Sequence, residues 1–195
     1  HKPNTQIVLG LRDVLDDPDL LSKEWARKGA IEATEKFYDE LWVYGLKSIY
    51  DPTSGLALSD ETKRKMHWTG YLRRENLDES VPIGEPYVLI TPGGGGDGAA
   101  MVDQVLSAYE QDPNLSPSAL LVYGPFLTGD TRAVFENRVS KLKGRVKTVG
   151  FDSHMETLMS GAIGVVAMGG YNTFCEILSF DKPAVIIPRT VPRLE

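Results

Sequence analysis

Residues 164–189, GVVAMGGYNTFCEILSFDKPAVIIPR, join two apolar runs through a glycine pair and a segment of helical composition. Gly164–Ala167 and Ala184–Ile187 are short, continuous apolar runs, as expected of strands that are buried on both faces of a sheet. Between them, Thr173–Phe180 predicts a helix. A strand, a helix and a second strand in this order predict a parallel βαβ unit, which indicates the α/β class.

The same alternation of strand and helix patterns precedes this stretch. The predicted order is strand Tyr87–Ile90, helix Gly98–Glu110, strand Leu120–Tyr123, helix Asp130–Leu142, strand Val146–Val149 and helix His154–Ser160. Each strand is again a continuous apolar run rather than an alternating one. We therefore expect a Rossmann-like parallel sheet with helices on both faces.

The first part of the chain is less regular. Strands are predicted at Gln6–Leu11, Leu41–Tyr44 and His67–Tyr71, with a polar helical region from Asp17 to about Tyr38. Residues 73–86 are charged, contain prolines and follow no helical or strand period, so they are the best candidate for a linker. The chain resembles a fragment at both ends.

Composition excludes several classes of protein. The 195 residues have 42% hydrophobic side chains, one cysteine and a net charge of −6. A single cysteine argues against a disulfide scaffold and for a reducing compartment, so a cytoplasmic protein is expected. The net negative charge does not favour nucleic-acid binding, although a global charge does not exclude a local basic patch. No apolar run approaches the ~20 residues that span a bilayer.

A glycine-rich turn, TPGGGGDGAA, lies at residues 91–100, between a predicted strand and a predicted helix. Backbone amides and the helix dipole favour an anion at such a position. Gly93, Gly95 and Gly98 satisfy GxGxxG, but the acidic residue expected about 20 positions later is absent. Ala99 and Ala100 stand where a phosphate-binding P-loop needs Lys and Ser or Thr. The glycine-rich turn is therefore equally consistent with ligand binding and with a tight turn that has no ligand.

A second strand-to-helix turn, Met168–Asn172, is also suited to an anion. Thr173 and Glu176 have the spacing of a capping box, in which each side chain satisfies a backbone amide at the helix start. Alternatively, the Glu176 carboxylate accepts hydrogen bonds from two neighbouring hydroxyls, such as those of a ribose. From the local pattern alone, the cap is favoured by about two to one.

Met168–Arg189 resembles the donor-binding signature in the C-terminal domain of GT-B glycosyltransferases, particularly the family that includes the peptidoglycan N-acetylglucosaminyltransferase MurG. The shared order is a glycine turn, Thr, Glu three residues later, a helix, then Lys182 and Pro183 before an apolar strand that ends in proline. Leu9–Pro18, LGLRDVLDDP, together with GGYNTFCEIL resembles a bacterial group of predicted glycosyltransferases related to that family. The resemblance covers nearly the whole chain.

This resemblance implies a Rossmann-like parallel sheet of GT-B type. Residues 1–78 would be the C-terminal part of the N-terminal acceptor domain with the start of the linker. Residues 79–195 would be the C-terminal nucleotide-sugar-binding domain, nearly complete but truncated at its end. The implied reaction is hexosyl transfer from a nucleotide-diphosphate-sugar, expected to be a UDP-sugar, to an unknown acceptor hydroxyl. No cofactor or metal is expected, and peripheral membrane association through regions outside this chain is compatible with the resemblance.

The resemblance also assigns site residues. Those expected around the donor are Gly169, Gly170, Tyr171, Asn172 and Thr173 at the diphosphate, Glu176 at the ribose, Phe151 and Met155 at the nucleobase, and Gly93, Gly94, Gly95 and Gly96 near the phosphates or the acceptor. Asn172 departs from the related enzymes, which often have an apolar residue there. The catalytic base is expected in an earlier glycine-rich loop that this chain lacks, so no catalytic residue is assigned.

Other residues and functions are weaker candidates. Ser153 and Glu156 form a second capping-box pattern, and Arg12 and Arg189 follow apolar runs, where a solvated charge is favoured over a phosphate contact. The three histidines and Cys175 have no metal-ligand spacing. A GT-B-fold nucleotide-sugar epimerase and a non-catalytic nucleotide-sugar-binding module remain alternatives to the transferase.

Overall fold

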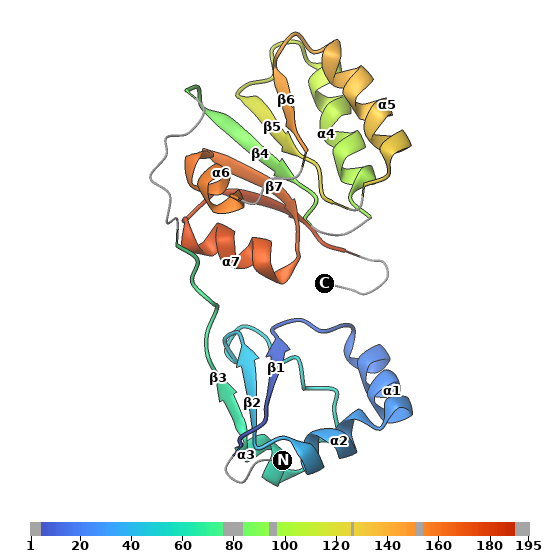
Figure 1. Cartoon of the computed structure of the whole chain (residues 1–195), viewed down its shortest axis with the longest axis vertical. Coiled ribbons are helices and arrows are strands. Elements are labelled where there is room, and N and C mark those ends of the chain that lie inside the picture. The colour runs from blue at the N-terminus through green and yellow to red at the C-terminus, as the bar shows by residue number, and fades with distance from the viewer. Residues whose placement is uncertain (1–4, 76–83, 94–96, 126, 151–153, 190–195) are drawn as a thin grey trace. The chain divides into compact units, whose positions relative to one another are not determined.

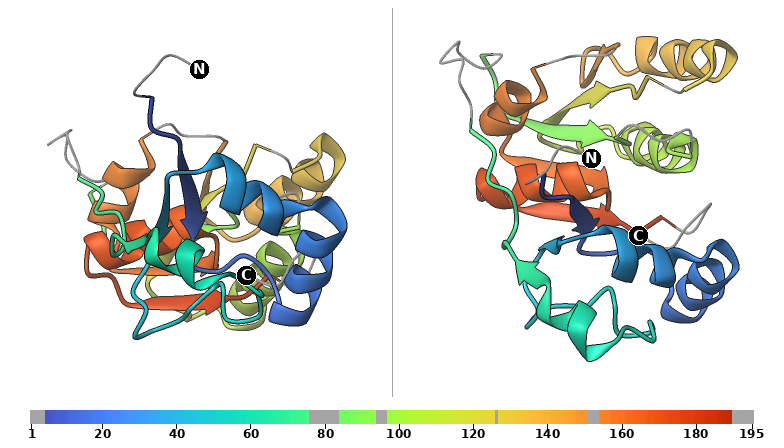
Figure 2. Two further views of the ribbon diagram at one scale, coloured as in Figure 1. Left: turned by 90° about the horizontal axis from the view of Figure 1, so that it is seen from below. Right: turned by 60° about the horizontal axis from the view of Figure 1, so that its bottom comes forward.

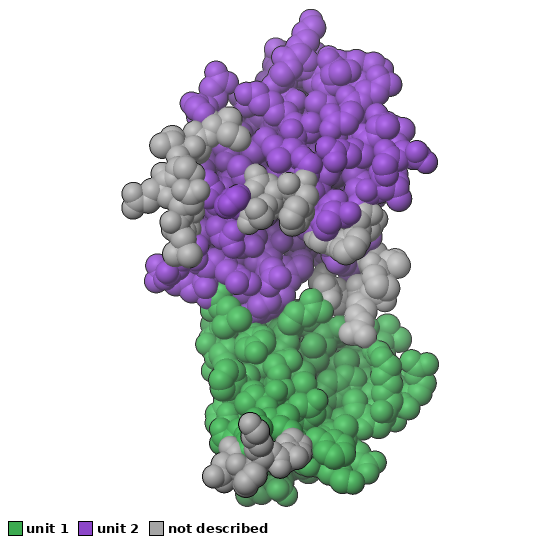
Figure 3. Space-filling view, in the orientation of Figure 1, with its two compact units in different colours: residues 1–72, 190–195 green, residues 73–189 purple. Residues whose placement is uncertain are grey.

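The computed structural model of the chain describes residues 5–75, 84–93, 97–125, 127–150 and 154–189. The chain divides into two compact units, of which the first runs to Leu72 and the second spans Arg73–Arg189 (Figure 3). Each unit has its own parallel sheet. The domain boundary expected after residue 78 falls outside the described ranges and stays a prediction.

The first unit contains a three-stranded sheet in the order β1-β2-β3 (Figure 1). Its elements are β1 (Val8–Arg12), α1 (Pro18–Lys28), α2 (Ala30–Phe37), β2 (Glu40–Tyr44), α3 (Asp60–Arg64) and β3 (Met66–Trp68). Asp17 caps α1, because its carboxylate accepts hydrogen bonds from the Asp19 and Leu20 amides, and Pro18 occupies the first turn. Gly29, with φ of 63°, separates α1 from α2. The short helix α3 was not predicted.

The second unit contains a five-stranded parallel sheet in the order β6-β5-β4-β7-β8 (Figure 1). Its elements are β4 (Tyr87–Thr91), α4 (Ala99–Gln111), β5 (Ser118–Val122), α5 (Gly129–Ser140), β6 (Val146–Val149), α6 (Met155–Gly161), β7 (Gly164–Met168), α7 (Tyr171–Ser179) and β8 (Ala184–Ile187). Every strand and helix predicted from Tyr87 onward is present, with ends shifted by at most two residues.

Helices cover both faces of this sheet. Successive strand residues point to opposite faces, so Ile90 joins one core cluster and Leu89 the other. The first cluster holds Val102 and Leu106 of α4 with Phe135 of α5, and these two helices lie side by side (Figures 1 and 2). The second cluster contains Met159 of α6 and Ile177 of α7. Burial on both faces explains the continuous apolar runs.

The order of the strands reverses beside β4. From β4 the chain builds β5 and β6 on one side, and then returns to place β7 and β8 on the other. In open parallel sheets, ligands bind outside the carboxyl ends of the strands at such a reversal. A ligand-binding site is therefore expected at the turns that follow β4 and β7.

Candidate functional site

The two glycine turns meet at the strand-order reversal. Thr91 pairs with Ala167, so the chain leaves β4 and β7 at neighbouring positions. A Cβ atom built on Gly93 would lie 3.8 Å from Oγ1 of Thr173. Gly93 has a φ of +70°, which a residue with a side chain rarely adopts. One residue from each sequence motif is thus brought to the same place, whereas Gly94, Gly95 and Gly96 lie outside the described residues.

Helix α4 begins close against this glycine turn. A Cβ on Gly98, the N-cap residue, would lie only 2.0 Å from Cβ of Pro92. Gly98 is therefore required by the close approach of the two chain segments. No side chain caps α4. Its first amides face the region after β4, where a helix start favours an anion.

Helix α7 begins earlier than the sequence predicted. Its N-cap is Gly170, and the Phe174 amide donates to the Gly170 carbonyl oxygen at 3.0 Å. Thr173 therefore lies inside the first turn, and the N-cap residue, Gly170, makes no side-chain cap. The predicted Thr173–Glu176 capping box is wrong, because the glycine pair lets the helix start at Tyr171.

Glu176 lies one turn further along α7 and is half-buried. Among the described residues, no hydrogen bond engages its carboxylate. Burial, reinforced by the nearby negative charge of Glu156 and opposed by Arg74, raises the pKa of Glu176 to about 7. With the capping role removed, Glu176 is a partly desolvated carboxylate whose acceptor capacity is available to a ligand.

Arg74 forms hydrogen bonds with two residues of α7. The sequence did not indicate it as a site residue. Its Nη2 donates to Oδ1 of Asn172 at 3.1 Å, and its backbone amide donates to Oγ of Ser179 at 2.8 Å. Its Nε is buried and has no hydrogen-bond partner in the described part of the chain. Arg74 and Asn172 are 98 residues apart in sequence, so no local motif signals this contact. The side-chain oxygen of Asn172 is engaged by Arg74.

Arg189 reaches the glycine turn after β4. Its side chain is only 18% exposed, its Nη2 donates to the Pro92 carbonyl oxygen at 3.3 Å, and the same atom lies 3.6 Å from Oδ1 of Asp97. Nη2 would also lie 3.7 Å from a Cβ on Gly93. The expectation of a solvated strand-end charge is wrong for Arg189, because its side chain folds back over the turn. Arg12, in contrast, is exposed.

The predicted nucleobase residues are only partly described. Met155 begins α6, where it is half-buried and packs against the second core cluster. Phe151 lies outside the described residues. The N-cap of α6 is His154, which is exposed and makes no side-chain cap. The second predicted capping box begins at Ser153, which lies outside the described residues, so it stays a prediction. Cys175 is buried, as expected of a small core residue.

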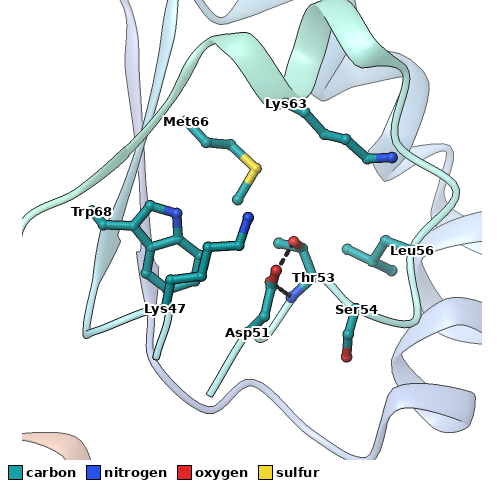
Figure 4. A pocket seen from close by; sticks show the side chains of 8 residues that line it. All are labelled: Lys47, Asp51, Thr53, Ser54, Leu56, Lys63, Met66 and Trp68. Carbon is teal, nitrogen blue, oxygen red and sulfur yellow. Dashed lines mark hydrogen bonds between the residues drawn. The ribbon is translucent and has the colours of Figure 1, made fainter. Parts of the chain in front are cut away.

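The first unit contains a separate pocket of about 360 Å³ (Figure 4). Its lining residues are Lys47, Asp51, Thr53, Ser54, Leu56, Lys63, Met66 and Trp68. The carboxylate of Asp51 accepts hydrogen bonds from the amide and the hydroxyl of Thr53, at 2.9 and 2.6 Å. None of the residues that the sequence assigned to the donor lines this pocket.

The described ranges contain neither a metal-ligand cluster nor a membrane-spanning helix. Within these ranges, no three His, Cys, Asp or Glu side chains gather closely enough to hold a metal ion. No helix in the described part of the chain is both long and apolar enough to cross a membrane.

The model of the glycosyltransferase family 28 C-terminal domain matches residues 88–191, which is more than half of the chain. The chain belongs to glycosyltransferase family 28. The matched segment begins in β4 and includes both glycine turns, α7 and Arg189. The family match and the site found from geometry therefore fall on the same part of the molecule.

Curated relatives are longer than this chain. An uncharacterized glycosyltransferase from Methanosarcina acetivorans is 25% identical over 165 residues, which are 80% of this chain and 41% of the relative. The UDP-N-acetylglucosamine–N-acetylmuramyl-(pentapeptide) pyrophosphoryl-undecaprenol N-acetylglucosamine transferase of Carboxydothermus hydrogenoformans is 27% identical over 128 residues, which are 64% of this chain and 33% of that protein. The chain thus spans less than half the length of either relative.

Solved structures confirm the predicted fold. A glycosyltransferase from Rickettsia africae superposes with a TM-score of 0.55 at 12% identity, covering 94% of this chain and 52% of that one. MurG from Acinetobacter baumannii superposes with a TM-score of 0.51 at 11% identity, covering 96% and 79% of the two chains. The family 28 chain is therefore an α/β protein of MurG-like GT-B fold.

Proposed function

We propose that this family 28 chain is part of a glycosyltransferase that moves a hexosyl group from a UDP-sugar to an acceptor hydroxyl. Its second unit would bind the donor at the strand-order reversal. The proposal rests on the position of Glu176, which lies one turn beyond the start of α7. Its side chain is half-buried, and its carboxylate has no hydrogen-bond partner among the described residues.

The geometry of α7 suits a nucleoside diphosphate. Amides at Tyr171, Asn172 and Thr173 lie in the first turn, where backbone donors and the helix dipole favour phosphate oxygens. One helical turn rises about 5.4 Å, so Glu176 lies about that far along the helix from the first amides. The ribose of a nucleoside diphosphate adjoins its first phosphate. The Glu176 carboxylate is thus suited to accept hydrogen bonds from the ribose hydroxyls while the diphosphate lies at the helix start.

The reaction would place developing charge at the same helix start. As the bond between the sugar's anomeric carbon and the diphosphate oxygen breaks, its electron pair goes to the diphosphate. The acceptor oxygen bonds to the anomeric carbon and loses its proton to a base, which is expected outside this chain. Preorganised amides stabilise charge that develops in a transition state. We propose that they supply this stabilisation without a metal ion.

We extend the proposal to the rest of the chain. Residues 1–78 would contribute to the acceptor-binding domain, and the nucleotide sugar and the acceptor would be the partners of the full protein. The single cysteine, buried in α7, supports a reducing, cytoplasmic location.

Calorimetric titration with UDP, UDP-sugars and GDP tests donor binding. The unmodified protein should bind UDP and UDP-sugars more tightly than GDP, and Glu176→Ala should weaken UDP binding about tenfold or more, because a charge-assisted hydrogen bond contributes about 1.5–3 kcal/mol. Glu32→Ala, which removes an exposed carboxylate from α2, is the matched control and should leave affinity unchanged.

Two results would overturn parts of this proposal. Equal UDP affinity of the unmodified protein and Glu176→Ala would remove Glu176 from the site. Product analysis of the full-length protein with UDP-N-acetylglucosamine addresses the reaction, since an isomerised sugar without transfer would identify an epimerase instead. Donor binding without either reaction, in the presence of an acceptor extract, would favour a non-catalytic module.

A further inference from the structure

Arg189 is incompletely satisfied where it lies. A guanidinium group has five N–H donors, yet among the described residues its contacts are the Pro92 carbonyl oxygen at 3.3 Å and the Asp97 carboxylate at 3.6 Å. The contact with Asp97 is longer than a hydrogen bond. Nε of Arg189 is buried and has no hydrogen-bond partner within the described ranges. A charge that is 18% exposed and has unused donors is costly unless another group engages it.

The side chain of Arg189 lies on the same turn as Thr173. Nη2 of Arg189 and Oγ1 of Thr173 both lie within 4 Å of the point where a Cβ on Gly93 would sit. Gly93 leaves that point unfilled. A phosphate held by the first turn of α7, which contains Thr173, would therefore come close to the guanidinium of Arg189.

We propose that Arg189 contacts the donor diphosphate, and that Asp97, which lies beside the guanidinium when no donor is bound, competes with the diphosphate for it. This inference rests on the proposed function and adds a specific residue and its competitor to it. Arginine matches phosphate with paired, charge-assisted hydrogen bonds, which the long contact with Asp97 does not provide. In the reaction, Arg189 would stabilise the departing diphosphate together with the amides of α7.

If Arg189 contacts the diphosphate, replacing it should lower the affinity for ligands that contain a diphosphate and leave the affinity for the nucleoside unchanged. Arg189→Gln should weaken UDP and inorganic pyrophosphate binding about tenfold or more, with uridine binding unchanged, while Arg189→Lys should keep part of the affinity because a point charge remains. Asp97→Asn should strengthen UDP binding severalfold, because it removes the competing carboxylate. In the double variant Arg189→Gln/Asp97→Asn, the effect of Asp97→Asn should disappear, since coupled residues are not additive. Lys147→Gln, which removes an exposed positive charge from β6, is the control for net charge.

Calorimetry on these variants, each checked by circular dichroism and thermal unfolding, decides between the outcomes. Unchanged UDP and pyrophosphate affinity in Arg189→Gln would overturn the proposal. An Asp97→Asn variant that weakens UDP binding would show that the pair only holds the turn in place. The protein could bind pyrophosphate in an Arg189-dependent way but bind neither uridine nor UDP. That result would support the role of Arg189 and contradict the UDP-sugar proposal. Binding of none of the three ligands would overturn both.

Discussion

The raised pKa of Glu176 makes pH a direct probe of its role. Burial and Glu156 raise this pKa to about 7 in the folded chain, above the ordinary value of 4.5. The ionised carboxylate is the better acceptor for ribose hydroxyls. UDP affinity should therefore increase as pH rises from 6 to 8, and Glu176→Gln should flatten this dependence. Calorimetry at both pH values measures it, and an affinity that falls with pH in the unmodified protein would contradict the assignment.

The same residue makes the free energy of unfolding depend on pH. Because the folded-state pKa lies above the unfolded one, the folded chain binds more protons between pH 4.5 and about 7. This contribution to stability is fully present below pH 4.5 and is lost as pH rises through about 7. Urea unfolding should show Glu176→Gln gaining stability relative to the unmodified protein at pH 8 but not at pH 4.5. A variant that is relatively less stable at pH 8 would refute the burial argument.

At the scale of single elements, the start of α4 depends on Gly98. A methyl group at this position would meet Cβ of Pro92 at 2.0 Å, so either the glycine turn or the helix start must move. Gly98→Ala should cost about 1–3 kcal/mol in the free energy of unfolding and should also weaken UDP binding, because the turn carries Gly93.

Gly129→Ala is the matched control for this substitution. Gly129 begins α5, and a Cβ there would meet nothing within 4 Å. This variant should be neutral or slightly stabilised. Urea unfolding of both variants provides the comparison, and equal stabilities would show that the contact between Gly98 and Pro92 does not constrain the turn.

The elements of the second unit were predictable because they obey local rules. Continuous apolar runs marked its strands, and glycine turns marked the helix starts of α4 and α7. The exact start of α7 was not predictable, because Thr173 and Glu176 have a good capping spacing whether or not the helix already began at Tyr171. The backbone conformation of Gly170, which only the structure shows, decides between the two.

The contacts of Arg74 and Arg189 could not be predicted from local sequence. Arg74 bonds to a residue 98 positions away, and Arg189 to one 97 positions away. Such pairs depend on the order of strands β4, β7 and β8, which a single sequence leaves open. The sequence therefore indicated the two glycine turns and Glu176, whereas the positions of Arg74 and Arg189 beside them are seen only in the folded chain.

At the scale of the whole molecule, the two units each form a parallel sheet of GT-B type, and the family match falls on the second. Three features of that unit meet at its strand-order reversal: the turn at Gly93, the start of α7 and the guanidinium of Arg189. This convergence supports our proposal that the second unit binds the donor.

Hydrogen–deuterium exchange of the protein with and without UDP tests whether the second unit binds the donor. UDP should protect the backbone amides at the start of α7, from Tyr171 to Thr173, and the turn at Gly93, while amides of β1 to β3 exchange as before. Protection confined to the first unit, or no change at either turn under saturating UDP, would contradict donor binding by the second unit.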